Sequence, residues 1–213
     1  MTTDIITVHD DLDGREPALV SAEKFAEYND IKGKNAMYVR LLTEEALGMI
    51  HGIMHNFKGE LWLESEPAEQ GLICRVHVRT PRGVTEAQEH KLLAVSSTGR
   101  NESAKGIIGK IRELIRMGTQ NTDSAAEARN MGGTLDGWFN MGLPHSDMSY
   151  INDYYVGYWS LDTYRDNLEA EDDAPQEAYD ELERSIIAKL ADDVKVWLRS
   201  DSTEVVIEKL LKN

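Results

Sequence analysis

The sequence is poor in cysteine and in long apolar runs, and each shortage excludes a class of protein. Cys74 is the single cysteine among 213 residues, which excludes an intrachain disulfide framework and a cysteine-rich zinc site. No apolar run reaches the roughly 18 residues that a membrane span needs, and the opening residues MTTDIITVHDDLDG lack the basic start and apolar core of a signal peptide. We therefore expect a soluble, cytoplasmic protein with no membrane partner.

Basic residues are also scarce, because 23 lysines and arginines stand against 38 aspartates and glutamates and leave a net charge of −15. The overall field of so acidic a chain repels phosphates, so no nucleic-acid partner is expected. The hydrophobic share of 41% and the charged share of 29% are ordinary for globular proteins and argue against disorder of the whole chain. We expect a single domain over 1–213, a length that can bury a sizeable core.

The charge is distributed unevenly along the chain. Residues 150–213 hold 16 acidic and 7 basic side chains, whereas residues 75–118 hold nine basic and four acidic ones. A basic island in an acidic protein attracts phosphate or an acidic partner. We expect instead that the island forms ion pairs with the acidic C-terminal third, because charge runs usually form solvated or mutually paired faces.

Hydrophobic periodicity predicts strands and helices along most of the chain. The expected strands are DIITVHD, Glu60–Glu64, Leu72–Val78, Tyr154–Tyr164, Val194–Arg199 and Glu204–Leu210. The expected helices begin at Ser21 and cover Lys34–Met54, Glu86–Ala94, Ser103–Met117 and Pro175–Leu190. Residues 118–149 lack a pattern and are expected to form an irregular insertion. No internal repeat is visible, and the order predicts an α+β two-layer sandwich with helices on one face of a mixed, mainly antiparallel sheet.

The helix expected over Lys34–Met54 is the clearest in the sequence. Its apolar stripe consists of Met37, Leu41, Leu42, Ala46, Met49, Ile50 and Ile53. Gly48 and Gly52 each cost roughly 1 kcal/mol relative to alanine inside a helix. We therefore expect another backbone or a ligand to approach this helix closely.

The same helix carries two candidate sites. Glu45 is a candidate general base if it faces a cleft, and otherwise an ordinary surface glutamate. His51 and His55 have the i, i+4 spacing of a zinc pair. Gly52 stands where the metalloprotease motif has its glutamate, and no third ligand is fixed nearby by spacing, so no metal site is predicted.

The loop before the helix expected at Ser103 is a candidate anion site. Small residues at a helix start leave backbone N–H groups free, and the helix dipole adds partial positive charge. The candidate binding residues are Ser97, Thr98, Gly99, Arg100, Asn101, Lys105 and Gly106. The loop is not a Walker A motif, because Lys105 is followed by glycine, and an ordinary capped helix is the alternative.

Two further groups are expected to serve packing. Cys74 and His77 are three residues apart on one expected strand, so they point to opposite faces and cannot form a nucleophile–base pair. Cys74 is expected to be a core residue. The aromatic cluster consists of Tyr154, Tyr155, Tyr158, Trp159 and Tyr164. Such a run can bind a ligand, but core packing is the expected role.

The segment SIIAKLADDVKVWLRSDSTEVVIEKL, from Ser185 to Leu210, resembles the end of GHKL (Bergerat-fold) ATPase domains, especially the anti-sigma-factor serine kinases. Those domains end with a helix reading leu-ala-asp and a hairpin that closes with a threonine-led apolar strand. The N-terminal order of strand, helix and long helix with Glu45-Ala-Leu is also similar. The resemblance covers about 4–117 and 150–211, with the insertion at 118–149 near the family's lid.

The family's nucleotide boxes are changed in this sequence. Glu45 matches the family's general base, but Met49 stands where an asparagine holds magnesium, and a thioether does not ligate a hard cation. Arg79 and Thr80 stand near the place of the adenine-reading aspartate, and Gly83 is what remains of that box. The acids Asp172 and Asp173 replace the glycine-rich phosphate loop and would repel a triphosphate.

The resemblance implies a bacterial, signalling-type regulatory domain with an eroded ATP site that acts by binding another protein. The alternative is a working ATP-binding protein or anti-sigma-type serine kinase, with Glu45 as base and Arg100 and Lys105 on the phosphates. A third alternative is a structural partner-binding protein without nucleotide, whose aromatic strand or basic island is the interface. ATP with magnesium is therefore not the favoured cofactor, a regulatory protein is the expected partner, and a homodimer is left open.

Overall fold

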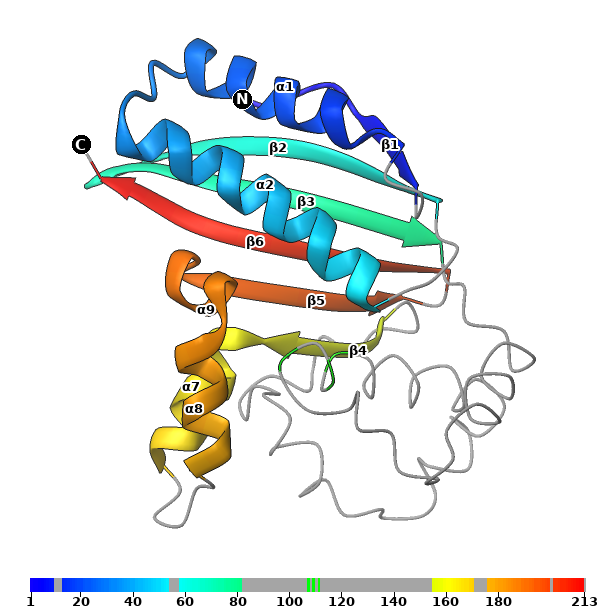
Figure 1. The fold of residues 1–213 in the computed structure, drawn as a ribbon, viewed down its shortest axis with the longest axis vertical. Helices are drawn as coiled ribbons and strands as arrows, with labels where there is room; N and C mark the ends of the chain where they lie inside the picture. The colour runs from blue at the N-terminus through cyan, green and yellow to red at the C-terminus, as the bar shows by residue number, and fades with distance from the viewer. Residues whose placement is uncertain are drawn as a thin grey trace.

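In the part of the chain that the structure describes, the sheet has six strands in the order β1-β2-β3-β6-β5-β4 (Figure 1). The computed structural model describes residues 1–9, 13–53, 58–81, 107, 109, 111, 155–170, 176–199 and 201–212. The strands are β1 (Ile6–His9), β2 (Lys58–Ala68), β3 (Gly71–Pro81), β4 (Tyr155–Ser160), β5 (Asp193–Arg199) and β6 (Ser202–Lys212). The helices are α1 (Arg15–Tyr28), α2 (Lys34–Ile53), α7 (Leu161–Ala170), α8 (Gln176–Arg184) and α9 (Ile186–Leu190).

Every pairing between these strands is antiparallel. The two central strands, β3 and β6, pair along their full length from Gly71 opposite Lys212 to Pro81 opposite Ser202. The predicted α+β class is confirmed. The parallel component of the expected mixed sheet is not found among the described strands, because each of them is joined to its neighbours in an antiparallel ladder.

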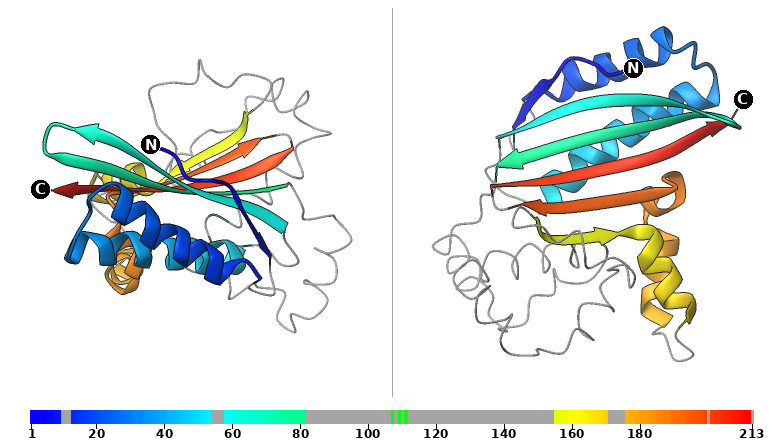
Figure 2. Two further views of the ribbon diagram at one scale, coloured as in Figure 1. Left: turned by 90° about the horizontal axis from the view of Figure 1, so that it is seen from above. Right: turned by 180° about the vertical axis from the view of Figure 1, so that it is seen from behind.

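The sheet is built from two halves with the same order of elements (Figure 2). Each half has an outer strand, then helices, then a hairpin whose two strands are separated by residues 69–70 or 200–201. The halves meet where β3 pairs with β6, and the antiparallel pairing relates them by an approximate two-fold axis through the sheet. The order of strands and helices is thus the same in both halves, although no internal repeat is visible in the sequence.

One face of the sheet packs on the helices and forms the core. Strand residues alternate between buried and partly exposed, as a sheet with one covered face requires. The strand residues on this face include Leu61, Leu63, Val76, Val78, Val194, Val196, Val205 and Ile207. They pack on Phe25 of α1, Leu42 of α2 and Ile187 of α9. Full burial of such a side chain contributes about 1.5–3 kcal/mol.

Helix α1 begins six residues earlier than the expected start at Ser21. Gly14 precedes it with a φ of +85°, and a Cβ at this position would lie 2.1 Å from the carbonyl oxygen of Thr7. Pro17 lies in the first helical turn, where its missing N–H has no intrahelical acceptor to lose. A proline that suggested a turn is therefore part of the helix.

The segment expected to be one strand over Tyr154–Tyr164 is a strand followed by a helix. Strand β4 ends at Ser160 and α7 begins at Leu161. The Ser160 hydroxyl accepts a hydrogen bond from the N–H of Thr163 at 3.3 Å, and Asp193 accepts one from the N–H of Asp162 at 3.0 Å. These two acceptors satisfy the free N–H groups of the helix start.

The last expected helix, Pro175–Leu190, is divided in two. Ser185 separates α8 from α9, and its hydroxyl accepts a hydrogen bond from the N–H of Ala188 at 3.2 Å. Of the helix expected over Ser103–Met117, the described residues 107, 109 and 111 are helical, and Ile107 and Ile111 are buried. The expected helix Glu86–Ala94 and the insertion at 118–149 lie outside the described residues. No helix in the described part of the chain is long and apolar enough to cross a membrane.

Candidate functional site: the charged face of the sheet

The candidate anion site cannot be placed in this structure. Its residues, Ser97, Thr98, Gly99, Arg100, Asn101, Lys105 and Gly106, all lie outside the described residues. The same holds for His55, the second member of the candidate zinc pair, whereas His51 lies exposed on α2. Among the described residues, no three acidic, histidine or cysteine side chains are grouped so that they could hold a metal ion.

Glu45 lies half-buried on α2, and burial raises the pKa of its carboxyl, with the neighbouring charge of Glu44 adding to the rise. Met49, one turn further on, is a core residue with 4% of its surface exposed. The Met49 side chain therefore packs in the core and contributes to its stability. Among the described residues no backbone approaches Gly48, because a Cβ there would meet none of their atoms within 4 Å.

The apolar stripe of α2 differs at its start from the expected one. Met37 is 59% exposed, while Val39 and Leu47 are buried. The rest of the stripe is confirmed at Leu42, Ala46, Met49 and Ile50, which are all buried.

Cys74 is a core residue, as predicted. Its side chain is fully buried, and burial raises the pKa of the thiol to about 12 against the smaller opposing effect of the Arg75 charge. His77 points to the other face of the sheet, where it contacts Trp62 and Glu204. The predicted separation of Cys74 and His77 is confirmed.

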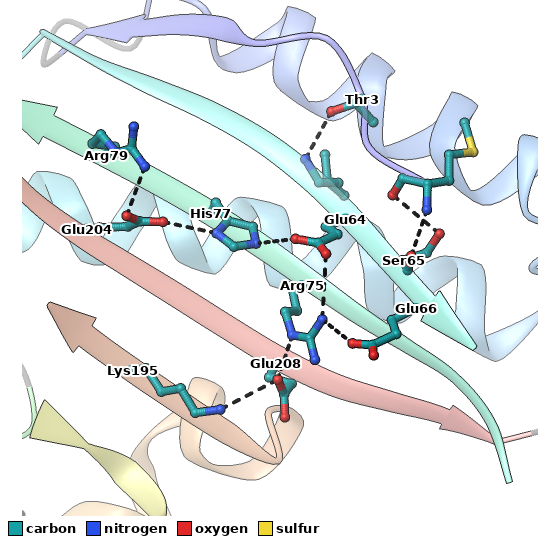
Figure 3. A network of polar contacts seen from close by, with 12 residues as sticks. Thr3, Glu64, Ser65, Glu66, Arg75, His77, Arg79, Lys195, Glu204 and Glu208 are labelled. Carbon is teal, nitrogen blue, oxygen red and sulfur yellow. Dashed lines mark hydrogen bonds and ion pairs between the residues drawn. The ribbon is translucent and has the colours of Figure 1, made fainter. Parts of the chain in front are cut away.

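The face of the sheet opposite the described helices (Figure 2) carries charged side chains, several of which are drawn in Figure 3, and aromatic ones, and we call it the charged face. Its residues follow the alternation of the strands and occupy matching positions in the register. They are Glu60, Trp62, Glu64 and Glu66 of β2, Arg75, His77 and Arg79 of β3, Glu204, Val206 and Glu208 of β6, Asp193, Lys195, Trp197 and Arg199 of β5, and Tyr158 of β4.

Glu204 is the centre of one half of this face. Its side chain is only 7% exposed and accepts hydrogen bonds from Arg79 at 3.1 Å and from Arg199 at 3.0 Å. The Nδ1 of His77 lies 3.2 Å from the Oε1 of the same carboxylate. Burial alone would raise the pKa of Glu204. The hydrogen bonds to His77 and Arg79, with the charges of Arg79 and Arg199, outweigh burial and lower this pKa.

His77 joins the two halves of the charged face. Its Nδ1 faces Glu204 at 3.2 Å and its Nε2 faces Glu64 at 3.3 Å, so both ring nitrogens lie beside carboxylates (Figure 3). Its ring stacks on Trp62 with centroids 4.7 Å apart and planes 10° apart. Arg79 lies over the Trp62 ring at 5.1 Å. The three strands β2, β3 and β6 are thereby linked through one imidazole.

Arg75 is the centre of the other half (Figure 3). Its Nε donates to Glu208 at 2.7 Å and its guanidinium donates to Glu66 at 2.7 Å, while Glu64 lies 3.8 Å away. Burial would lower the pKa of Arg75, but the hydrogen bonds to Glu208 and Glu66 raise it on balance. Lys195 lies 3.6 Å from Glu208 and completes the cluster.

These contacts show, for part of the basic island at residues 75–118, whether its basic side chains pair with the acidic C-terminal third. Arg75 and Arg79, its two described members, pair with Glu208 and Glu204 of the acidic C-terminal third. Internal pairing is therefore confirmed for these two residues. The other seven basic residues of the island lie outside the described part of the chain.

The aromatic cluster is divided between the two faces. Trp159 and Tyr164 are buried in the core with ring centroids 6.2 Å apart, which confirms the packing role for them. Tyr158 lies half-buried beside Trp197, with centroids 4.2 Å apart. Tyr154 lies outside the described residues.

The residues predicted from the sequence to form a site do not include Trp62, Trp197 or Glu204, which are central to the charged face. A signal was available, because Glu60-Leu-Trp-Leu-Glu64 and Arg75-Val-His-Val-Arg79 alternate charged or aromatic residues with apolar ones. Their partners across β6 and β5 depend on a register that such alternation does not specify. Comparison of the chain with protein-family models, curated proteins and solved structures finds no match.

Proposed function

We propose that this protein is a protein-binding module and that the charged face is its interface. The observation that carries the proposal is the grouping of Trp62, Trp197, Tyr158, Arg79 and Arg199 on one face that the described helices leave uncovered. Tryptophan, tyrosine and arginine are the residue types that dominate the binding energy of protein interfaces.

The contacts within the face support this role. Ion pairs hold Arg79 and Arg199 against Glu204, and His77 supports the Trp62 ring, so these side chains are ordered before a partner arrives. A preordered surface loses less conformational entropy on association. The face is therefore suited to binding without a large rearrangement.

The proposal includes a GHKL-like regulatory origin with an eroded ATP site. Its support is the resemblance of the C-terminal segment and the presence of Met49 at the magnesium position, where the side chain belongs to the core. The activity would then consist of binding a regulatory protein.

A working ATP-binding protein is the second candidate, and the raised pKa of Glu45 favours it because a general base needs such a shift. A thermal-shift titration with ATP and magnesium tests it. A ligand at 100 times its dissociation constant stabilises the fold by about 2.7 kcal/mol. We expect no shift up to millimolar ATP. A clear shift that is lost in Lys105→Ala would favour the second candidate instead.

In-cell photocrosslinking tests the leading proposal. p-Benzoylphenylalanine is introduced in place of Trp197 on the charged face and, as a matched control, in place of Tyr28, which is 74% exposed on α1. We expect a discrete crosslinked partner from position 197 and none from position 28. Crosslinks from position 28 alone, or from neither position, would reject the charged face as the interface.

A further inference from the structure

The two halves of the charged face differ in their charge balance. The half around Arg75, which we call the acidic end, contains the carboxylates of Glu64, Glu66, Glu208 and Asp193 and the basic groups of Arg75 and Lys195. Four carboxylates stand against two bases. The half around Glu204 is more evenly balanced, because the carboxylates of Glu204 and Glu60 stand against Arg79 and Arg199, with His77 beside Glu204.

The exposed groups at the acidic end are carboxylates. The Glu66 side chain is 55% exposed and that of Glu64 is 38% exposed, whereas Arg75 between them is only 21% exposed. A molecule that approaches this end therefore meets negative charge first. A carboxylate accepts about four hydrogen bonds, so the single bond from Arg75 leaves most of the accepting capacity of Glu66 unused.

The position of Arg75 limits what can bind here. Its guanidinium occupies the point on which Glu64, Glu66 and Glu208 converge, so a metal ion cannot take that place without displacing a paired cation. The sign of the charge disfavours phosphates. A second copy of the chain would bring together two molecules of net charge −15.

We propose that the partner presents a lysine- or arginine-rich segment to the acidic end of the charged face. This inference rests on the proposed protein-binding function and names the chemistry of its partner. The net charge of −15 accelerates the encounter with a basic protein, and Glu64 and Glu66 fix where the basic segment binds.

Fluorescence anisotropy with two labelled probes tests the proposal. The probes are a peptide of alternating lysine and glycine and a peptide of the same length with alternating glutamate and glycine. The variants are Glu66→Lys at the acidic end and Glu27→Lys on the exposed surface of α1, which change the net charge equally. We expect the lysine peptide to bind, with a loss of about tenfold in Glu66→Lys and less than about twofold in Glu27→Lys.

The outcomes separate this inference from the proposed function. Equal losses in the two variants would show attraction by overall charge alone and would overturn the basic segment at the acidic end. Preference for the glutamate peptide, or self-association without peptide binding, would also overturn it. The photocrosslinks from position 197 are measured independently, so their absence rejects the interface itself, whereas their presence with a failed peptide test rejects only the partner's chemistry. Glu66 is exposed, so both variants are expected to fold.

Discussion

Replacing Glu204 by glutamine is the sharpest test of how the charged face is held together. Glu204→Gln keeps the shape of the side chain but removes the charge that pairs with Arg79 and Arg199. Breaking a fully buried pair costs about 3–5 kcal/mol, because the remaining charge stays in the interior. Here Arg79 is 38% exposed and Arg199 is 33% exposed, so water can solvate both guanidinium groups after the change. We therefore expect a smaller loss of about 2 kcal/mol in the free energy of unfolding.

Urea unfolding at pH 7 measures this loss, and Glu66→Gln is the matched control. Glu66 is 55% exposed, so its ion pair with Arg75 is worth about 0–0.5 kcal/mol. In thermal unfolding the Glu204→Gln variant should melt roughly 4–8 °C below the wild type. Equal effects of the two substitutions would refute the central role of Glu204.

The same variant has a defined pH dependence. The folded structure lowers the pKa of Glu204, so its ionised form stabilises the fold above the ordinary pKa of a glutamate. That stabilisation is lost as the pH falls through the lowered pKa. The difference in stability between wild type and Glu204→Gln should therefore be largest near neutral pH and should shrink below about pH 4. A difference that grows towards low pH would contradict the pairing.

Three further predictions concern the fold. Gly71→Ala should destabilise the fold by more than about 2 kcal/mol, because φ is +152° and the new Cβ would lie 2.0 Å from the Leu211 carbonyl oxygen. Gly48→Ala, with no described atom near the new Cβ and inside a helix, should stabilise the fold by about 1 kcal/mol in the same urea assay. Similar free energies of unfolding for the two variants would refute both predictions. Cys74, with its pKa raised to about 12, should resist thiol reagents until the protein unfolds, and rapid labelling of the native protein would refute its burial. Glu45→Gln should raise the melting temperature slightly at neutral pH, since burial raises the pKa of Glu45 and its charged form opposes folding. This gain should vanish as the pH falls and Glu45 becomes protonated. A gain in melting temperature that persists at low pH would contradict the prediction.

Local patterns in the sequence predicted much of the fold. The strands expected at Glu60–Glu64 and Leu72–Val78 are the centres of β2 and β3, because alternation of apolar residues marks a half-covered sheet. Their ends were missed, since β2 continues through Ser65–Ala68 to a turn at residues 69–70 and β3 continues through Arg79–Pro81. The break after Ser160 was also missed, because its capping acceptors include Asp193, which is distant in sequence.

The candidate site could be predicted only in part for a related reason. Which charges meet on the charged face depends on the register of β3 on β6, where the paired residues Arg75 and Glu208 are 133 residues apart in the chain. Alternation shows that Arg75 and Arg79 share a face, but it does not show that Glu208 and Glu204 lie opposite them. The expectation that the basic island pairs with the acidic C-terminal third was correct for these residues because opposite charges across strands stabilise a sheet.

The central claim is that the charged face binds a protein, and its most direct test is an affinity measurement on the partner that crosslinks from position 197. Calorimetry compares the wild type with Trp62→Ala on the charged face and Tyr28→Ala on α1, after circular dichroism confirms that both variants are folded. We predict a loss of about 30-fold for Trp62→Ala, the size expected for an interface anchor, and less than about twofold for Tyr28→Ala. Unchanged affinity in Trp62→Ala, or equal losses in both variants, would contradict the account.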